Sequence, residues 1–311
     1  MDCHVDESRG RIVRIALPAL VFALLGGCAA APAGLTIPTT ARNGTVEQIP
    51  AILHKPDGAG PFPAVVIMHD CSGLGPTSSG APERWAKELL AQGYVVVIPD
   101  SFSSRGHELG VCTDPSPSRN EVSPYRRARD AYAALSYLRG LPYVDGEHIG
   151  LLGRSHGAST TLVAMVASGG NWQPLGQEPA GFAAAVALFP ECNLPLGGWR
   201  NGAGVFKPRA PLLILIGEKD DWTPAEPCVN LAAAAQAAGY PVSLSVLPNA
   251  YHAFDSPEPV RHVAKVINRN APGGRGATIG GDPRAWRESI RQVDEFFAHY
   301  LQPRGTPSAR H

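Results

Sequence analysis

The sequence has no excess of charge of either sign. Its 311 residues carry 27 Lys and Arg against 27 Asp and Glu, and no run of like charges stands out. Proteins that bind nucleic acid usually carry a basic face, so this balance speaks against nucleic acid as a partner. Internal repeats and heptads are also missing, which excludes solenoid and coiled-coil architectures.

Cysteine is scarce, and none of the six cysteines has C-x-x-C spacing. That absence argues against a zinc or thiol-redox motif, and we expect no metal and no organic cofactor. The part of the chain that we expect to fold contains Cys71, Cys112, Cys192 and Cys228. Four cysteines allow three pairings, and spacing alone does not choose among them.

The amino terminus has the features of a targeting segment. Three arginines between residues 9 and 14 precede an apolar stretch, residues 15–25, that is short for a membrane span. The following "LGGC" resembles the bacterial lipoprotein box, which implies cleavage after Gly27 and a lipid on Cys28. The protein would then be exported and periplasmic, or anchored in the outer membrane by lipid alone. The alternative is an uncleaved membrane anchor.

The rest of the chain is long enough for one large domain. With 44% hydrophobic residues it can bury a single substantial core. We predict a signal peptide over residues 1–27, a flexible tether over 28–44, the folded domain over 45–302 and a disordered tail over 303–311.

Within that domain, apolar runs alternate with helix-like stretches. The runs are continuous rather than alternating, which is typical of strands buried on both faces of a parallel sheet. Three of the helix-like stretches, over residues 82–93, 124–140 and 224–240, have Pro near the start and Gly near the end. The pattern predicts a single doubly wound α/β domain. Its predicted strands cover residues 64–70, 94–100, 148–155, 183–190, 211–220 and 242–248, and its helices 82–93, 124–140, 156–170, 224–240 and 283–301.

Parallel sheets of this kind bind ligands at the carboxyl ends of their strands. Ser155, in "GRSHGA", lies there between Gly153 and Gly157, where a predicted strand turns into a helix. Small residues on both sides permit the sharp turn of a nucleophile elbow. The alternative interpretation is an ordinary helix cap.

A serine nucleophile needs a base, and the base needs an acid to orient it. His252 follows the last predicted strand, and the aspartates Asp220 and Asp221 follow the strand before it. Each of these residues alone is more often structural, as a turn or cap residue. Their joint occurrence in the order Ser, Asp, His favours a catalytic triad.

Five segments together resemble the dienelactone hydrolase family of α/β-hydrolases: "HDCSGLG", "IPDSFSSRG", "GLLGRSHGAST", "LIGEKDDWTP" and "YHAFD". The resemblance covers residues 45–302 and implies an α/β-hydrolase fold. It places Ser155 as nucleophile, His252 as base and Asp220 as acid, with Asp221 as the alternative acid.

An oxyanion hole in this architecture uses backbone N–H groups. We assign them to His156, which follows the serine, and to Cys71, which lies where the family has such a donor. The His156 side chain is given no role. Arg105 lies near a position where some members of the family contact a substrate carboxylate, and Trp222 is a candidate wall of the pocket.

Two positions depart from the family. Its best-known members have a cysteine nucleophile where this chain has Ser155, and a glutamate where this chain has Asp70. Ordinary serine esterase chemistry is therefore the safer inference. The family architecture also implies the disulfides Cys71–Cys112 and Cys192–Cys228 on the active-site side.

We therefore predict a serine hydrolase that cleaves small carboxylic esters or lactones through an acyl-enzyme. A serine peptidase or acyltransferase with the same triad, or a non-catalytic envelope binding protein, are the alternatives. The glycine-rich segment 256–283 is either a lid on the pocket or a surface covering, and the sequence does not choose.

Overall fold

The computed structural model describes residues 34–41, 43–167 and 181–302. The predicted signal peptide, the lipidation site Cys28 and the predicted tail over 303–311 lie outside these residues. Among the helices of the described part, none is long and apolar enough to cross a membrane.

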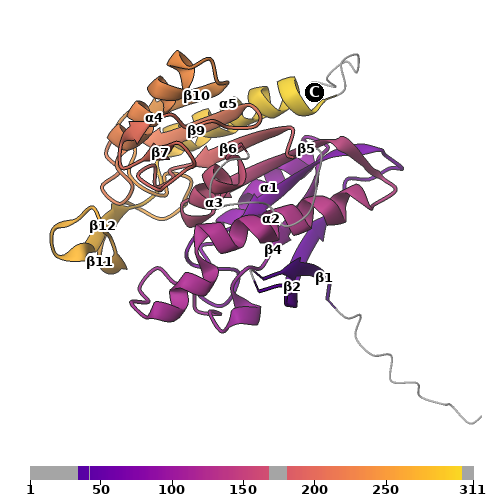
Figure 1. Ribbon diagram of the computed structural model, residues 1–311, viewed down its shortest axis with the longest axis horizontal. Helices are drawn as coiled ribbons and strands as arrows, with labels where there is room; N and C mark the ends of the chain where they lie inside the picture. Colours follow the sequence, from indigo (N-terminus) through magenta and orange to yellow (C-terminus); the bar gives the residue numbers. More distant parts are fainter. Residues whose placement is uncertain (1–33, 42, 168–180, 303–311) are drawn as a thin grey trace, which may run out of the picture. The chain divides into compact units, whose positions relative to one another are not determined.

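An eight-stranded sheet forms the centre of the fold, in the order β1-β2-β4-β3-β5-β6-β9-β10 (Figure 1). The six strands from β4 to β10 in this order are parallel, and β2 and β1 add an antiparallel edge. The strands are β1 Thr36–Thr40, β2 Val46–His54, β3 Phe62–Met68, β4 Val95–Pro99, β5 Val144–Arg154, β6 Ala184–Leu188, β9 Leu212–Gly217 and β10 Val242–Leu247.

The inner strands are buried on both faces, as their continuous apolar runs predict. Every residue of β4, β6 and β9 is buried. Because neighbouring side chains of a strand point to opposite faces, complete burial requires helices on both sides of the sheet.

The helices are α1 Ala81–Ala91, α2 Pro124–Arg139, α3 His156–Ala164, α4 Ala225–Ala237 and α5 Pro283–Leu301, with short helices η1 Ser103–Arg105, η2 Pro117–Val122 and η3 Pro272–Gly274. Two glycines of β5 show how closely they pack. A Cβ on Gly150 would lie 2.7 Å from the Leu301 side chain of α5, and one on Gly153 would collide with the carbonyl of Gly157 in α3. Since these glycines are three residues apart on one strand, α3 and α5 cover opposite faces.

The predicted tether is wrong in its second half. Thr36–Thr40, which we placed in the flexible segment 28–44, form β1 and pair with β2. Ile37 and Thr39 are buried, and the Thr39 hydroxyl donates to Asp130 at 2.9 Å. The strand is short and contains Pro38, which an edge strand tolerates, so its apolar signal was weak.

The segment 256–283 forms a hairpin outside the main sheet. Its strands, β11 Arg261–Ile267 and β12 Arg275–Ile279, pair only with each other among the described strands and lie apart from the sheet (Figure 1). A smaller pair, β7 Trp199–Arg200 and β8 Ala203–Gly204, lies between β6 and β9 in the sequence.

Candidate active site

Ser155 lies at a sharp turn between β5 and α3. Its backbone has φ 52° and ψ −115°, a conformation that is rare outside glycine and typical of a nucleophile elbow. Gly157 permits this turn because a Cβ there would collide with the backbone carbonyl of Met68. The two glycines of "GRSHG" are thus required by the close approach of β3, β5 and α3.

Ser155, His252 and Asp220 form one chain of hydrogen bonds. The Ser155 hydroxyl lies 2.9 Å from Nε2 of His252, and Nδ1 of His252 lies 2.8 Å from the Asp220 carboxylate. All three residues are buried. The arrangement can move a proton from the serine to the imidazole, whose orientation the carboxylate fixes.

Asp220 is itself held by the turn that follows β9. Its Oδ1 accepts from the backbone N–H groups of Trp222 and Thr223, at 3.0 and 2.8 Å. The Thr223 hydroxyl donates to Oδ2 at 3.0 Å and also lies 3.1 Å from Nδ1 of His252. Sequence reasoning missed Thr223, although its place three residues after an aspartate is a common capping pattern.

The structure brings Asp220, and not Asp221, to the histidine. Asp221 accepts from the backbone N–H and the hydroxyl of Thr278, at 2.7 and 2.8 Å, and so fastens the β11–β12 hairpin. Asn268 strengthens this attachment by donating to the Asp221 carbonyl at 2.9 Å. Two consecutive aspartates therefore have different tasks.

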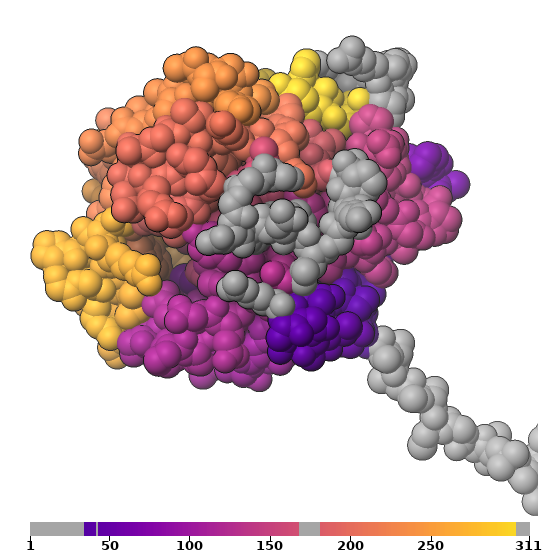
Figure 2. All heavy atoms as spheres, in the orientation of Figure 1, coloured from indigo at the N-terminus to yellow at the C-terminus, as the bar shows by residue number. Residues whose placement is uncertain are grey.

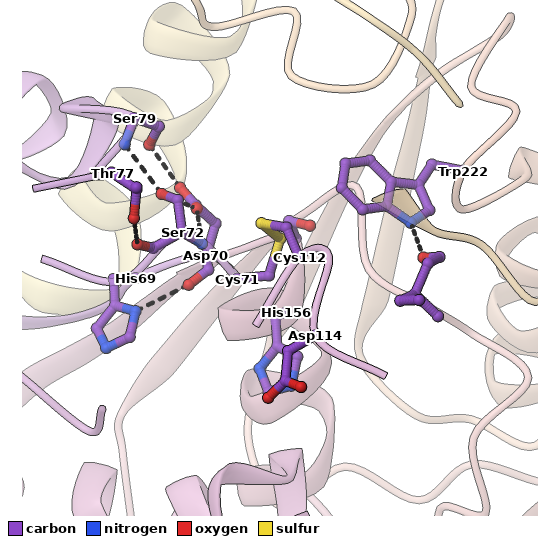
Figure 3. Close-up of a disulfide and its surroundings, with 12 residues drawn as sticks. His69, Asp70, Cys71, Ser72, Thr77, Ser79, Cys112, Asp114, His156 and Trp222 are labelled. Atoms are coloured by element: carbon purple, nitrogen blue, oxygen red, sulfur yellow. Dashed lines mark hydrogen bonds between the residues drawn. A yellow bond between two sulfur atoms is a disulfide. The ribbon is translucent and has the colours of Figure 1, made fainter. Parts of the chain in front are cut away.

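The disulfides join Cys71 to Cys112 and Cys192 to Cys228, as the family architecture implied. Figure 3 shows the first, with the His156 ring and Trp222 near it. Asp70 and this sulfur pair are the one group of described residues whose atoms are spaced like metal ligands. Both sulfurs are bonded to each other, so neither offers a thiolate.

A cavity of about 410 Å³ opens beside the serine. Cys71 and His156, whose N–H groups we assigned to the oxyanion hole, both line it, and so does Trp222. Its further lining includes apolar and charged side chains that the sequence did not single out: Val111, Arg119, Tyr125, Glu191, Leu194, Ile267 and Arg269.

Arg105 is not among the residues that line this cavity, so its predicted contact with substrate is wrong. Its guanidinium pairs with Asp130 at 2.7 Å and with Glu47 at 2.9 Å. It also donates to the carbonyl of Ser101 at 2.7 Å. The loop after β4 thus turns Arg105 toward α2 and β2, and these buried pairs use its charge.

The β11–β12 hairpin is a wall of the cavity, which settles the question that its sequence left open. Ile267, Arg269 and Asn270 contribute to the lining. The Ile267 N–H donates to the Cys112 carbonyl at 2.8 Å, and the Ile267 carbonyl accepts from the Trp222 ring at 2.9 Å. In Figure 2 the yellow-orange hairpin lies beside the magenta segment around Cys112.

Arg154, the residue before the serine, connects three loops of the site. Its guanidinium donates to the Asp255 carboxylate at 2.8 and 2.9 Å and to Asp70 at 2.5 Å. Asp70 precedes Cys71, and Asp255 follows His252 by three residues. One buried cation therefore connects three segments of the site: the elbow with the candidate nucleophile, the loop with the candidate oxyanion donor Cys71, and the loop with His252.

The two carboxylates are held by further donors. Asp70 accepts from the hydroxyls of Ser72 and Ser79 (Figure 3), and Asp255 accepts from the Trp85 ring at 2.9 Å. Burial alone would raise the pKa of Asp70, but Arg154 and the two serines hold it well below its usual value. The neighbouring carboxylates in turn raise the pKa of Arg154 against the effect of its burial.

A second buried arginine lies on the other side of the elbow. Arg127 of α2 donates to the carbonyl of His69 and to Nδ1 of His156, each at 2.7 Å, and lies over the Phe102 ring. No carboxylate of the described residues forms an ion pair with it. Burial, followed by the charge of Arg127, lowers the pKa of His69 to about 3 and that of His156 well below 6.5.

The fold and this site define the class. A mostly parallel sheet flanked by helices, with a serine at the elbow after β5 and a histidine after β10, is an α/β-hydrolase.

The family follows from comparison. The sequence profile described as "Dienelactone hydrolase family" matches residues 49–301. The chain belongs to that family, and it is a hydrolase.

The individual proteins to which this chain is similar share only a minority of its residues. A protein of Yersinia pestis named "Putative carboxymethylenebutenolidase" is 26% identical over 68% of this chain and 75% of its own length. The protein YcjY of Escherichia coli K12 is 31% identical over 41% of this chain and only 39% of its own length. Among solved structures, propionate-bound esterase 2 of Thermogutta terrifontis has a TM-score of 0.59 at 18% identity, covering 88% of this chain and 97% of that one. Likeness at that identity shows the fold alone.

Proposed function

We propose that this protein is a serine hydrolase that cleaves carboxylic esters or lactones through an acyl-enzyme. The observation that carries the proposal is the hydrogen-bonded chain Ser155–His252–Asp220, which meets a cavity of about 410 Å³ at the serine. An ordinary helix cap would need neither the strained backbone nor the buried imidazole.

In the proposed reaction the Ser155 oxygen attacks the acyl carbon while Nε2 of His252 takes its proton. The backbone N–H groups of Cys71 and His156 stabilise the oxyanion. His252 then gives its proton to the leaving alcohol. Water next attacks the acyl-enzyme, with His252 again as base, and Asp220 orients the imidazole throughout.

The two cations of the cavity lining outnumber its one carboxylate, Glu191, and support a substrate with an anionic group. Arg119 and Arg269 both line it, and burial and Arg269 together lower the pKa of Arg119, as expected for two cations near each other. In this proposal Arg119 and Arg269, and not Arg105, contact the carboxylate of the substrate. A lactone or ester with a carboxylate would also fit the carboxymethylenebutenolidase named among the relatives.

An organophosphorus reagent is the direct test, since esterase 2 of Thermogutta terrifontis is described as phosphorylated by paraoxon. We expect labelling of Ser155, located by peptide mapping, and turnover of short-chain p-nitrophenyl esters. Ser155→Ala should lose both. A folded, oxidised protein with neither label nor turnover would favour the non-catalytic binding protein.

The acid is tested by a matched pair of variants. Asp220→Asn should lower kcat by roughly 10²–10⁴-fold because the neutral amide does not hold the histidine in its working tautomer. Asp221→Asn should change kcat much less, because its carboxylate fastens the hairpin. A larger loss at position 221 would overturn the assignment of Asp220.

We further propose that the chain is exported and lipidated at Cys28. The lipoprotein-like "LGGC" supports this, and two disulfides fit a protein that folds outside the reducing cytosol. Mass spectrometry of the native protein should find a lipid-modified Cys28 as its first residue. An intact, unmodified Met1 would refute processing.

A further inference from the structure

The ring of His156 lies in the cavity wall, directly after the candidate nucleophile. The residue lines the cavity together with Ser155 and Ser159, and it is only partly buried. The reaction proposed above uses the backbone N–H of His156 and leaves its imidazole unexplained.

A contact on the far side of the ring fixes where its proton lies. Nδ1 of His156 lies 2.7 Å from a terminal nitrogen of the Arg127 guanidinium. A guanidinium can only donate, so Nδ1 must be an unprotonated acceptor. A neutral imidazole carries one N–H, and it must therefore be on Nε2.

The surroundings also keep the ring neutral. Burial, Arg127 and His69 all hold the pKa of His156 well below 6.5. Nε2–H makes no hydrogen bond to any described residue, and Nε2 is not among the fully enclosed atoms that lack a partner. The ring therefore has an unused N–H donor, on Nε2, beside a cavity large enough for a small ester.

We infer that His156 determines specificity by donating a hydrogen bond from Nε2 to an acceptor oxygen that the substrate carries in addition to its reacting carbonyl. The inference rests on the proposed function. The class of substrate is an ester or lactone with an ether, keto or hydroxyl oxygen within a few bonds of the acyl carbon. Arg127 strengthens the donor, because its charge polarises the imidazole through Nδ1. No proton is transferred in this contact.

The test uses pairs of esters in which an ether oxygen or a keto group takes the place of one methylene. Suitable ether pairs are the p-nitrophenyl esters of methoxyacetate and butyrate, and of 3-methoxypropionate and pentanoate. The keto pair is levulinate and pentanoate. His156→Phe keeps a planar ring and removes both polar atoms. His156→Gln is the matched control, because its amide can accept from Arg127 and still donate into the cavity.

The readout is the ratio of kcat/KM between the members of a pair, so a general loss of activity cancels. We expect His156→Phe to lower the ratio about tenfold or more for at least one pair, and His156→Gln to restore most of it. If no pair changes by more than about twofold, or if both variants slow all esters equally, the ring only packs and the inference fails. A wild type that hydrolyses no ester of the panel contradicts the proposed function instead.

A spectroscopic measurement tests the tautomer without any turnover. In the ¹⁵N-labelled full chain, the ring nitrogens of His156, assigned by comparison with His156→Phe, should show a proton on Nε2 and none on Nδ1. At pH 6.5, where an ordinary histidine is half protonated, the ring should still be neutral. A ring protonated on Nδ1, or one that is already partly a cation at pH 6.5, would overturn the inference whatever the activity.

Discussion

Two buried arginines flank the nucleophile elbow, and they differ in the partners that surround their charge. Arg154 is bonded to two carboxylates, Asp70 and Asp255. Arg127 is as deeply buried but donates to a carbonyl and an imidazole, and its Nε has no hydrogen-bond partner among the residues that the structure describes. Burial lowers the pKa of Arg127, whereas the carboxylates raise that of Arg154.

The difference shows two uses of a cation near one reaction centre. The charge of Arg154 is neutralised by its partners, so it acts as a connector between loops. The charge of Arg127 is left uncompensated by ion pairs, so it acts on the electronic state of its neighbours, His69 and His156. Three changes test this contrast.

The largest effect is expected when the connector is removed. Arg154→Met leaves the carboxylates of Asp70 and Asp255 buried without a cation, which should lower the free energy of unfolding by about 3–5 kcal/mol. Urea denaturation of the oxidised protein at pH 7 measures it. A loss below about 1 kcal/mol would show that the two carboxylates do not depend on Arg154.

A smaller loss is expected at the other arginine. Arg127→Met also deletes buried hydrogen bonds, but it removes an unpaired charge with its own desolvation cost. The His69 carbonyl and the His156 ring lose a partner, for a net loss of about 1–3 kcal/mol. The same denaturation series compares the two variants directly. Equal losses at the two positions would abolish the distinction between connector and free charge.

The third change concerns pH. The folded-state pKa of His156 is depressed, so the unfolded chain binds a proton that the folded protein does not, and stability falls as pH drops below 6.5. His69 acts in the same direction, down to about pH 3. His156→Phe should flatten the decline between pH 6 and pH 4 by up to about 1.4 kcal/mol per pH unit.

Asp70 provides a control in a different pH range. Its folded-state pKa is also depressed, so its contribution is complete above 3.8 and is lost only as pH falls below that value. Asp70→Asn should therefore leave the slope between pH 6 and pH 4 almost unchanged. If the His156→Phe and wild-type curves are parallel, the neutral state of that ring in the folded protein is refuted.

The parts of the site that the sequence predicts are those set by local pattern. Ser155, Asp220 and His252 each follow a strand that its apolar run reveals, and parallel strands bring their carboxyl ends to one edge. The choice between Asp220 and Asp221 and the pairing of the four cysteines needed the resemblance to the family.

The parts that the sequence does not predict depend on contacts between distant segments. Arg154 lies 84 residues from Asp70 and 101 from Asp255, so nothing local marks the connection. The resemblance to the family suggests a substrate contact for Arg105, but Asp130 of α2 holds its guanidinium. The hairpin lacked a signal because its exposed, polar strands alternate too weakly to stand out.

The turn of the hairpin is a part of this protein that can be exchanged without rebuilding the sheet. β11 and β12 share no hydrogen-bonded strand with the main sheet, and Asp221, Trp222 and Cys112 fix the hairpin through Thr278 and Ile267. At its far end the Gly280 N–H donates to the His252 carbonyl at 3.0 Å, so this bond must be kept as well. A graft that keeps these anchors and replaces Arg269 changes the cavity wall while the elbow and the sheet register stay as they are. New substrates can therefore be reached by exchanging one module at the rim.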